Sequence, residues 1–143
     1  MLVEKVKHLE LIQAVISRMA GNSALLKGWS VTLSSALVGW ASANNAHIKY
    51  AILGFLPPVF FAVLDAFYLR QERLFRKLYD YIRLLDDAEW QKDPFTMDTR
   101  PFAGLVQRWF RTIFTTVVFL PHFLVVLMVA GILVFWVYIL TSL

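Results

Sequence analysis

Three long apolar stretches constrain this chain more than any other feature: residues 25–44, 48–69 and 113–140. An α-helix rises about 1.5 Å per residue, so twenty residues cover roughly 30 Å, the thickness of the hydrocarbon core of a bilayer. The third stretch is longer than that, and we expect it to tilt, to bend at Pro121 or to begin at the membrane surface. The pattern predicts an all-α integral membrane protein with three transmembrane helices.

The composition supports this fold class. Hydrophobic residues make up 59% of the 143 residues and charged residues 17%, below the roughly 25% of soluble domains. The chain contains no cysteine, which excludes disulfides, thiolate metal ligands and cysteine nucleophiles. Glu4 and Glu10 lie where a signal peptide needs a basic segment and an apolar core. We therefore expect the apolar stretches themselves to direct insertion.

The basic residues indicate an orientation rather than a nucleic-acid partner. The net charge is +4, but the lysines and arginines flank the apolar stretches instead of forming one patch. With the N-terminus inside, three crossings leave only Lys49 of the fourteen basic residues outside. This distribution follows the positive-inside rule. It predicts an inner-membrane protein with a cytoplasmic N-terminus and a periplasmic C-terminus, and it argues against nucleic-acid binding.

Residues 1–21 read as a cytoplasmic amphipathic helix. Gly21 is expected to end it, and Asn22 or Ser23 to cap the next helix. The apolar face could pack on a neighbouring helix or lie on the membrane surface, and the acidic residues favour packing. The residues of this apolar face recur at three- and four-residue steps: Leu2, Val6, Leu9, Ile12, Ile16 and Met19.

The first apolar stretch, residues 25–44, is only weakly apolar, and a polar turn at residues 43–47 follows it. Its small residues are regularly spaced, and small residues let helix backbones approach closely in lipid. We call them the small-residue seam: Gly28, Thr32, Ser35, Gly39 and Ser42. The seam could pack against the second stretch or between copies of the protein.

The second stretch, residues 48–69, contains two unusual features. Pro57 and Pro58 lie near its middle and predict a kink. Asp65 is the only acidic residue of the apolar stretches, and an ionisable group inside a membrane is a candidate for function. A structural ion pair with Lys27 or Arg70 is the interpretation that we favour.

Residues 70–87 are expected to continue the second helix into the cytoplasm. Their apolar stripe needs a partner, and residues 1–21 are the nearest candidate, so the two predict a cytoplasmic helical bundle. The stripe consists of Leu74, Leu78, Ile82 and Leu85. Residues 88–112 then form a loop and an interfacial segment, whose loop could be a lid, a partner-docking element or a plain linker.

The sequence contains no catalytic constellation. His8, His47 and His122 fall on different elements, so we expect no metal site. No glycine-rich phosphate loop is present either. His122 could relay protons or line a pore, or simply bond a carbonyl group. We expect neither an enzyme nor a cofactor.

Two segments carry a resemblance: RMAGNSALLKGW at residues 18–29 and LDAFYLRQERLFRKLYD at residues 64–80. Residues 5–85 resemble a family of small bacterial inner-membrane proteins from defence-type gene neighbourhoods, some of them near TIR-domain proteins. The resemblance implies a membrane effector of antiviral immunity that a cytosolic sensor switches on. The effector would then damage or depolarise the membrane.

If the trigger is a nucleotide made by a TIR enzyme, the resemblance implies a phosphate site near the inner surface. Guanidinium groups suit phosphate through bidentate donation, and an aromatic ring could stack on the base. The residues that we expect to bind this ligand or a partner are Arg18, Asn22, Lys27, Trp29, Asp65, Tyr68, Arg70 and Arg73.

The leading hypothesis from the sequence is a homo-oligomeric membrane effector that permeabilises the bilayer. One alternative is a constitutive adaptor that anchors a soluble partner enzyme. Another is a channel or transport subunit, which would need several copies, because three helices with one Asp and one His offer little polar path.

Overall fold

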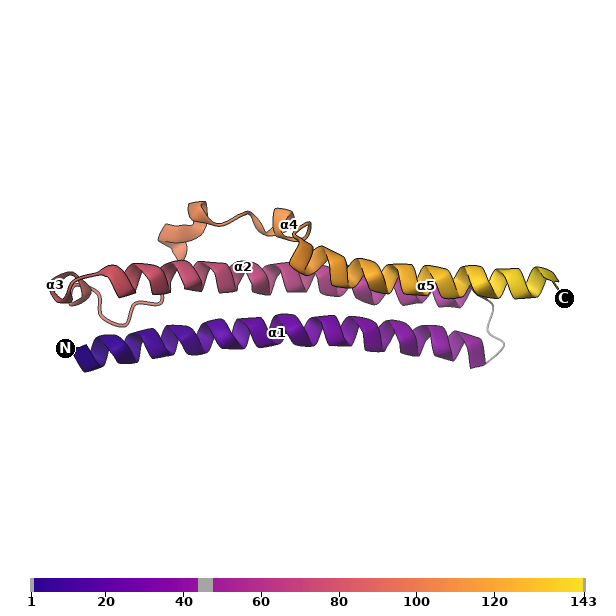
Figure 1. Ribbon diagram of the computed structural model, residues 1–143, viewed down its shortest axis with the longest axis horizontal. Helices are drawn as coiled ribbons and strands as arrows, with labels where there is room; N and C mark the ends of the chain where they lie inside the picture. Colours follow the sequence, from indigo (N-terminus) through magenta and orange to yellow (C-terminus); the bar gives the residue numbers. More distant parts are fainter. Residues whose placement is uncertain (1, 44–47, 143) are drawn as a thin grey trace.

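The computed structural model describes residues 2–43 and 48–142, which form helices and no strands. The molecule is elongated (Figure 1): one long helix runs along most of it, and a second runs back beside it. A third lies along the C-terminal half of the first helix and extends past its end. The elements are α1 (Leu2–Ala43), the 3-10 helix η1 (Ile48–Phe55), α2 (Leu56–Leu84), α3 (Asp87–Trp90), the 3-10 helix η2 (Arg100–Leu105), α4 (Trp109–Thr112) and α5 (Thr116–Ser142).

Helix α1 is unbroken over 42 residues, a length of roughly 63 Å. The prediction that one helix ends at Gly21 and another begins at Asn22 or Ser23 is therefore wrong. A single glycine costs a helix only about 1 kcal/mol, and the packing of α1 along η1 and α2 offsets this cost. Of the predicted polar turn, residues 44–47 lie outside the described residues, and His47 with them.

The second apolar stretch changes helix type at its proline pair. It begins as η1 and becomes α-helical at Leu56, so Pro57 and Pro58 lie in the first turn of α2. There a missing N–H leaves no intrahelical hydrogen bond unmade. The prediction of a kink inside one continuous α-helix is therefore wrong, because the prolines lie where the 3-10 helix η1 ends and α2 begins. Beyond this junction α2 continues without a break into the charged segment and ends at Leu84, three residues before the predicted end of this extension at residue 87.

Helix α5 begins at Thr116 and passes through Pro121 without interruption. The residues just before it form α4 and a short turn, so the third helix starts slightly later than residue 113. Two helices among the described residues are long and apolar enough to cross a membrane: Tyr50–Leu84 and Thr116–Ile139. The stretch 25–44 is not one of them, because its serines and threonine lower the hydropathy of that part of α1.

Two apolar clusters hold the helices together. The first, which we call the stalk cluster, joins the N-terminal half of α1 to the end of α2 and to α3; its buried members are Ile12, Ile16, Leu78, Ile82 and Trp90. Two residues of the predicted stripe on α2, Leu78 and Ile82, therefore pack against the N-terminal half of α1. The buried face of α1 differs from the predicted apolar stripe at one point. Val6, a predicted member, is exposed, and the polar His8 is buried instead.

The second cluster joins α2 to the start of α5 through Ala66, Leu69 and Val118. Farther along, α1, η1 and α5 converge on Gly54. A Cβ atom added to Gly54 would lie 2.8 Å from Cγ2 of Val38 and 3.4 Å from Cγ1 of Val129. Only a residue without a side chain fits between these helices.

Candidate functional site

The one acidic residue of the three apolar stretches, Asp65, is completely buried on α2. Nζ of Lys27 on α1 lies 2.6 Å from its Oδ2 atom. The hydroxyl group of Ser23 donates to Oδ1 over 2.5 Å, and Nζ of Lys27 donates to the same hydroxyl over 2.8 Å. The predicted ion pair of Asp65 is therefore formed with Lys27. Arg70 instead donates to the carbonyl oxygen of Gln107 over 3.2 Å.

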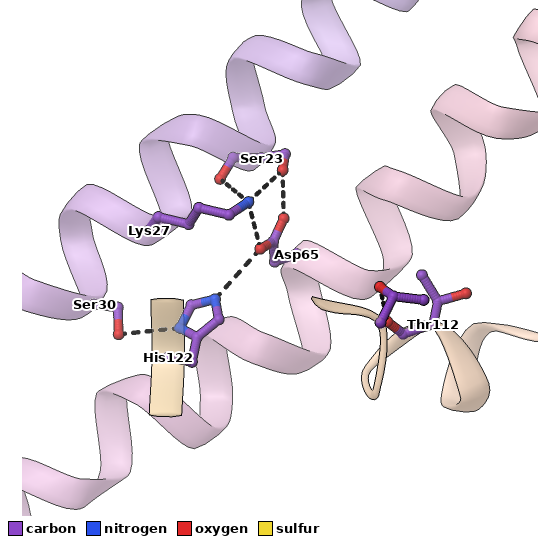
Figure 2. A network of polar contacts seen from close by, with 7 residues as sticks. Ser23, Lys27, Ser30, Asp65, Thr112 and His122 are labelled. Carbon is purple, nitrogen blue, oxygen red and sulfur yellow. Dashed lines mark hydrogen bonds and ion pairs between the residues drawn. The ribbon is translucent and has the colours of Figure 1, made fainter. Parts of the chain in front are cut away.

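His122 on α5 extends this cluster to a third helix (Figure 2). Its Nε2 atom lies 3.4 Å from Oδ2 of Asp65, and its Nδ1 atom lies 3.2 Å from Oγ of Ser30 on α1. The residue is only 4% exposed, and both of its ring nitrogens have a polar partner inside the protein. We call Ser23, Lys27, Ser30, Asp65 and His122 the buried polar cluster.

One face of α1 supplies most of the cluster. Ser23, Lys27, Ser30 and Ser34 follow one another at steps of four, three and four residues, which places them on the same side of the helix. His122 lies six positions after the start of α5, roughly 9 Å along the helix axis. Charged groups away from water are costly unless they are paired, which explains why Asp65 gathers three polar partners.

The chemistry available here is acid–base and electrostatic. A carboxylate, an ammonium group, an imidazole and two hydroxyl groups can donate, accept and pass protons. The described residues contain no group of three His, Asp or Glu side chains placed to hold a metal ion. The side chains of the cluster can therefore take up and release protons.

The eight ligand residues that the resemblance implies do not come together in one place. Only Lys27 and Asp65 touch. Trp29 lies on the exposed side of α1, in a shallow groove with Gly21, Leu25 and Gly28. Among the described residues no hydrogen bond or ion pair links the pair to the remaining five, which are exposed or half-buried: Arg18, Asn22, Tyr68, Arg70 and Arg73.

The small-residue seam faces away from the other helices. All five of its residues are exposed, and a Cβ atom added to Gly28 or Gly39 would meet nothing within 4 Å. The face of α1 that packs on η1, α2 and α5 is the neighbouring one, with Ser30, Ser34 and Val38. Packing of the seam against the second apolar stretch is therefore not seen, and packing between copies stays a prediction.

A second buried polar group lies at the other end of the molecule. His8 is completely buried; Nε1 of Trp90 donates to its Nδ1 atom over 3.0 Å, and its Nε2 atom lies 2.9 Å from the carbonyl oxygen of Thr96. In the turn that follows, hydrogen bonds from the side chain of Arg100 lower the pKa of Asp98 below its usual 3.8. The segment after α3 is thus anchored to α1 rather than being a plain linker.

Sequence reasoning missed the roles of Ser30 and His8, and it treated Ser23 only as a helix cap. A usable signal existed for the first cluster, because four polar residues share one face of a helix that is otherwise weakly apolar. No local signal pointed to His8, whose partners lie more than 80 residues away.

Comparison of the chain with protein-family models, curated proteins and solved structures finds no match. The fold and site define the class directly: an all-helical protein with two candidate membrane-spanning helices and a buried cluster of ionisable side chains. The likeness of residues 5–85 to proteins of bacterial defence stays a prediction.

Proposed function

We propose that this chain is a bacterial inner-membrane effector that crosses the membrane three times, assembles from several copies and lets ions pass when a cytosolic signal arrives. The observation that carries the proposal is the buried polar cluster, in which Asp65 and His122 lie within the two candidate spanning helices. Ionisable side chains inside a bilayer are costly, and they commonly mark ion or proton pathways.

The contacts of α1 support a third crossing. Ser30 reaches His122, and Val38 packs on Gly54, so this part of α1, residues 25–43, lies beside η1 and α5. Two of its serines, Ser30 and Ser34, are turned inward and buried. Its low hydropathy then reflects polar groups that lie away from lipid, as in other packed membrane helices.

The topology has a direct test. In Figure 1 the N-terminus and α3 lie at one end of the molecule and the C-terminus at the other. Three crossings put the two termini on opposite sides of the membrane, whereas two crossings, by Tyr50–Leu84 and Thr116–Ile139 alone, put them on the same side. Reporter domains that are active on only one side, fused to each terminus in turn, distinguish these cases. Reporters active on the same side at both termini would disprove the three-span topology.

Assembly is proposed to use the exposed small-residue seam. A three-helix chain with one buried cluster offers too little polar surface for a complete path, so several copies are needed. The combined change of Ser35→Leu and Gly39→Leu fills the seam and should abolish crosslinking between copies in native membranes. Val31→Leu, on an exposed part of α1 outside the seam, is the matched control. Unchanged crosslinking in the seam variant would rule out this interface.

Ion passage is tested by membrane potential. Cells that express the chain together with its gene neighbours should lose potential when phage infects them; the resemblance implies a TIR-type sensor, or the nucleotide that it makes, as the trigger. Asp65→Asn should suppress this loss, and Asp80→Asn, on an exposed charge of α2, should not. If the chain is an adaptor, the potential stays constant in every case while a soluble partner still binds to the membrane.

A further inference from the structure

The buried polar cluster is drawn out into a line along the helices. From Asp65 it passes through the imidazole ring of His122 to the hydroxyl group of Ser30 (Figure 2). Ser34 lies one turn farther along the same face of α1, about 6 Å on. The line therefore has two parts, an ionised end at Lys27 and Asp65 and a neutral end at the two serines.

Ser34 is the unusual member of this line. Its side chain is completely buried, and among the described residues its Oγ atom has no hydrogen-bond partner. Buried hydroxyl groups are nearly always hydrogen-bonded, to protein or to ordered water. The backbone of Gly54 passes close to Ser34, since a Cβ atom added to Gly54 would lie 3.6 Å from the carbonyl oxygen of Ser34. A water molecule between Ser30 and Ser34 would satisfy both hydroxyl groups.

The two ends of the line differ in their access to solvent. The side chain of Lys27 is 24% exposed and lies near the start of the segment 25–44, so in the proposed topology the ionised end lies near the cytoplasmic surface. Beyond Ser34, on the far side from Lys27, the interior is apolar and closed. Buried residues of α1, η1 and α5 fill it: Val38, Ala41, Ala51 and Val129.

We propose that this line is a proton path that opens on the Lys27 side and is blocked at Val38, and that the proton is the ion that the active protein moves. The proposal rests on the function proposed above and names its permeant ion. The charged or titratable groups that face the line are Lys27 from α1, Asp65 from α2 and His122 from α5. Among the described residues no other such group has an ion pair or hydrogen bond with them.

Each transfer along the line is balanced. A proton that arrives at Oδ2 of Asp65 moves to Nε2 of His122 while the proton on Nδ1 leaves for Oγ of Ser30. Ser30 passes its own hydroxyl proton to a water molecule that the proposal requires between the two serines. That water would pass one of its protons to Oγ of Ser34, whose hydroxyl proton leaves once position 38 offers an acceptor. Each group releases one proton for each that it receives, and rotation of the ring and the hydroxyl groups resets the line.

The test extends the line past its block. Val38→Ser places a hydroxyl group one turn beyond Ser34. In vesicles that contain the purified protein and a trapped pH-sensitive dye, with potassium and valinomycin holding the voltage, this variant should raise the proton flux about tenfold above wild type. Val31→Ser makes the same change on the exposed side of α1 and should leave the flux at the wild-type level.

A second variant shows whether the flux uses the line. His122→Gln keeps hydrogen-bonding atoms near Asp65 and Ser30, but an amide group cannot take up a proton on one side and release one on the other. Added to Val38→Ser, it should return the flux to the wild-type level. The proposal is overturned if folded Val38→Ser protein carries no extra proton flux, if the flux survives His122→Gln, or if potassium passes equally well. A proton flux in vesicles without any loss of potential in infected cells would refute only the proposed function.

Discussion

The indole Nε1 group of Trp90 donates a hydrogen bond of 3.0 Å to Nδ1 of His8, which fastens the first turns of α1 to the segment that follows α2. Since Nδ1 accepts, the ring must carry its proton on Nε2, where it can donate to the carbonyl group of Thr96. The bond closes the end of the stalk cluster, where two helix ends would otherwise fray.

Trp90→Phe keeps an aromatic ring in the stalk cluster but removes the donor to His8. The Nδ1 atom of a completely buried ring then lacks a partner, and we expect a loss of about 1–3 kcal/mol in the free energy of unfolding. Thermal unfolding in detergent, followed by circular dichroism, measures this loss. Trp109→Phe, at an exposed tryptophan, is the control; equal melting temperatures for the two variants would contradict the prediction.

Gly54→Ala should destabilise the protein by about 1–3 kcal/mol, because the new Cβ atom would come within 2.8 Å of Val38. Val38→Ala in the same chain removes the clash, so the double variant should recover part of the loss. The stability of the four proteins in one detergent gives the coupling energy. Gly39→Ala, where the added atom meets nothing within 4 Å, should be neutral or slightly stabilising. Additive effects at positions 54 and 38 would show that the two residues do not press on each other.

Lys27→Met leaves the carboxylate of Asp65 buried without its cation. Breaking a buried pair on one side typically costs about 3–5 kcal/mol, and we expect a drop of that size in unfolding free energy. Combining the change with Asp65→Asn removes both charges and should restore most of the stability. Lys77→Met, on an exposed part of α2, controls for the loss of a lysine. A double variant no more stable than Lys27→Met alone would be evidence against the pair.

The turn at Asp98 and Arg100 should loosen in acid. Arg100 lowers the pKa of Asp98 from its usual 3.8, so the contribution of the pair is present above that usual value and is lost as the pH falls through the lowered one. Carbon-13 NMR of the Asp98 carboxyl group follows this titration. Arg100→Gln should move the midpoint upward, toward the usual value; an unchanged midpoint would mean that Arg100 does not hold the carboxylate.

Local patterns predicted the parts of the fold that depend on local properties. Apolar periodicity located α2 and α5, and the stripe through Leu78 and Ile82 required a partner that α1 provides. The ion pair of Asp65 was predictable because a buried carboxylate needs a cation and only two were near in the expected topology. The helix stop at Gly21 failed because packing along the full length of α1 overrides a weak local signal.

Contacts between distant parts of the chain could not be predicted in the same way. His122 meets Asp65 across 57 residues, and Trp90 meets His8 across 82. Such pairs depend on how far each helix slides along its neighbour, and hydrophobic periodicity does not fix that register. The prolines at residues 57 and 58 show the related limit, since the same residues suit a kink or a helix start.

Because α1 has no break, its two ends belong to one continuous helix and are expected to rotate together. Ile12 in the stalk cluster and Lys27 in the buried polar cluster lie on the same unbroken helix, so torque applied at the N-terminal end must reach Asp65. The face of α1 with Lys27, Ser34 and Val38 precedes the small-residue seam by one position, which is a turn of about 100° about the helix axis. A rotation of that size would bring the seam to Asp65 and carry the serines and Lys27 out to the lipid or to a neighbouring copy.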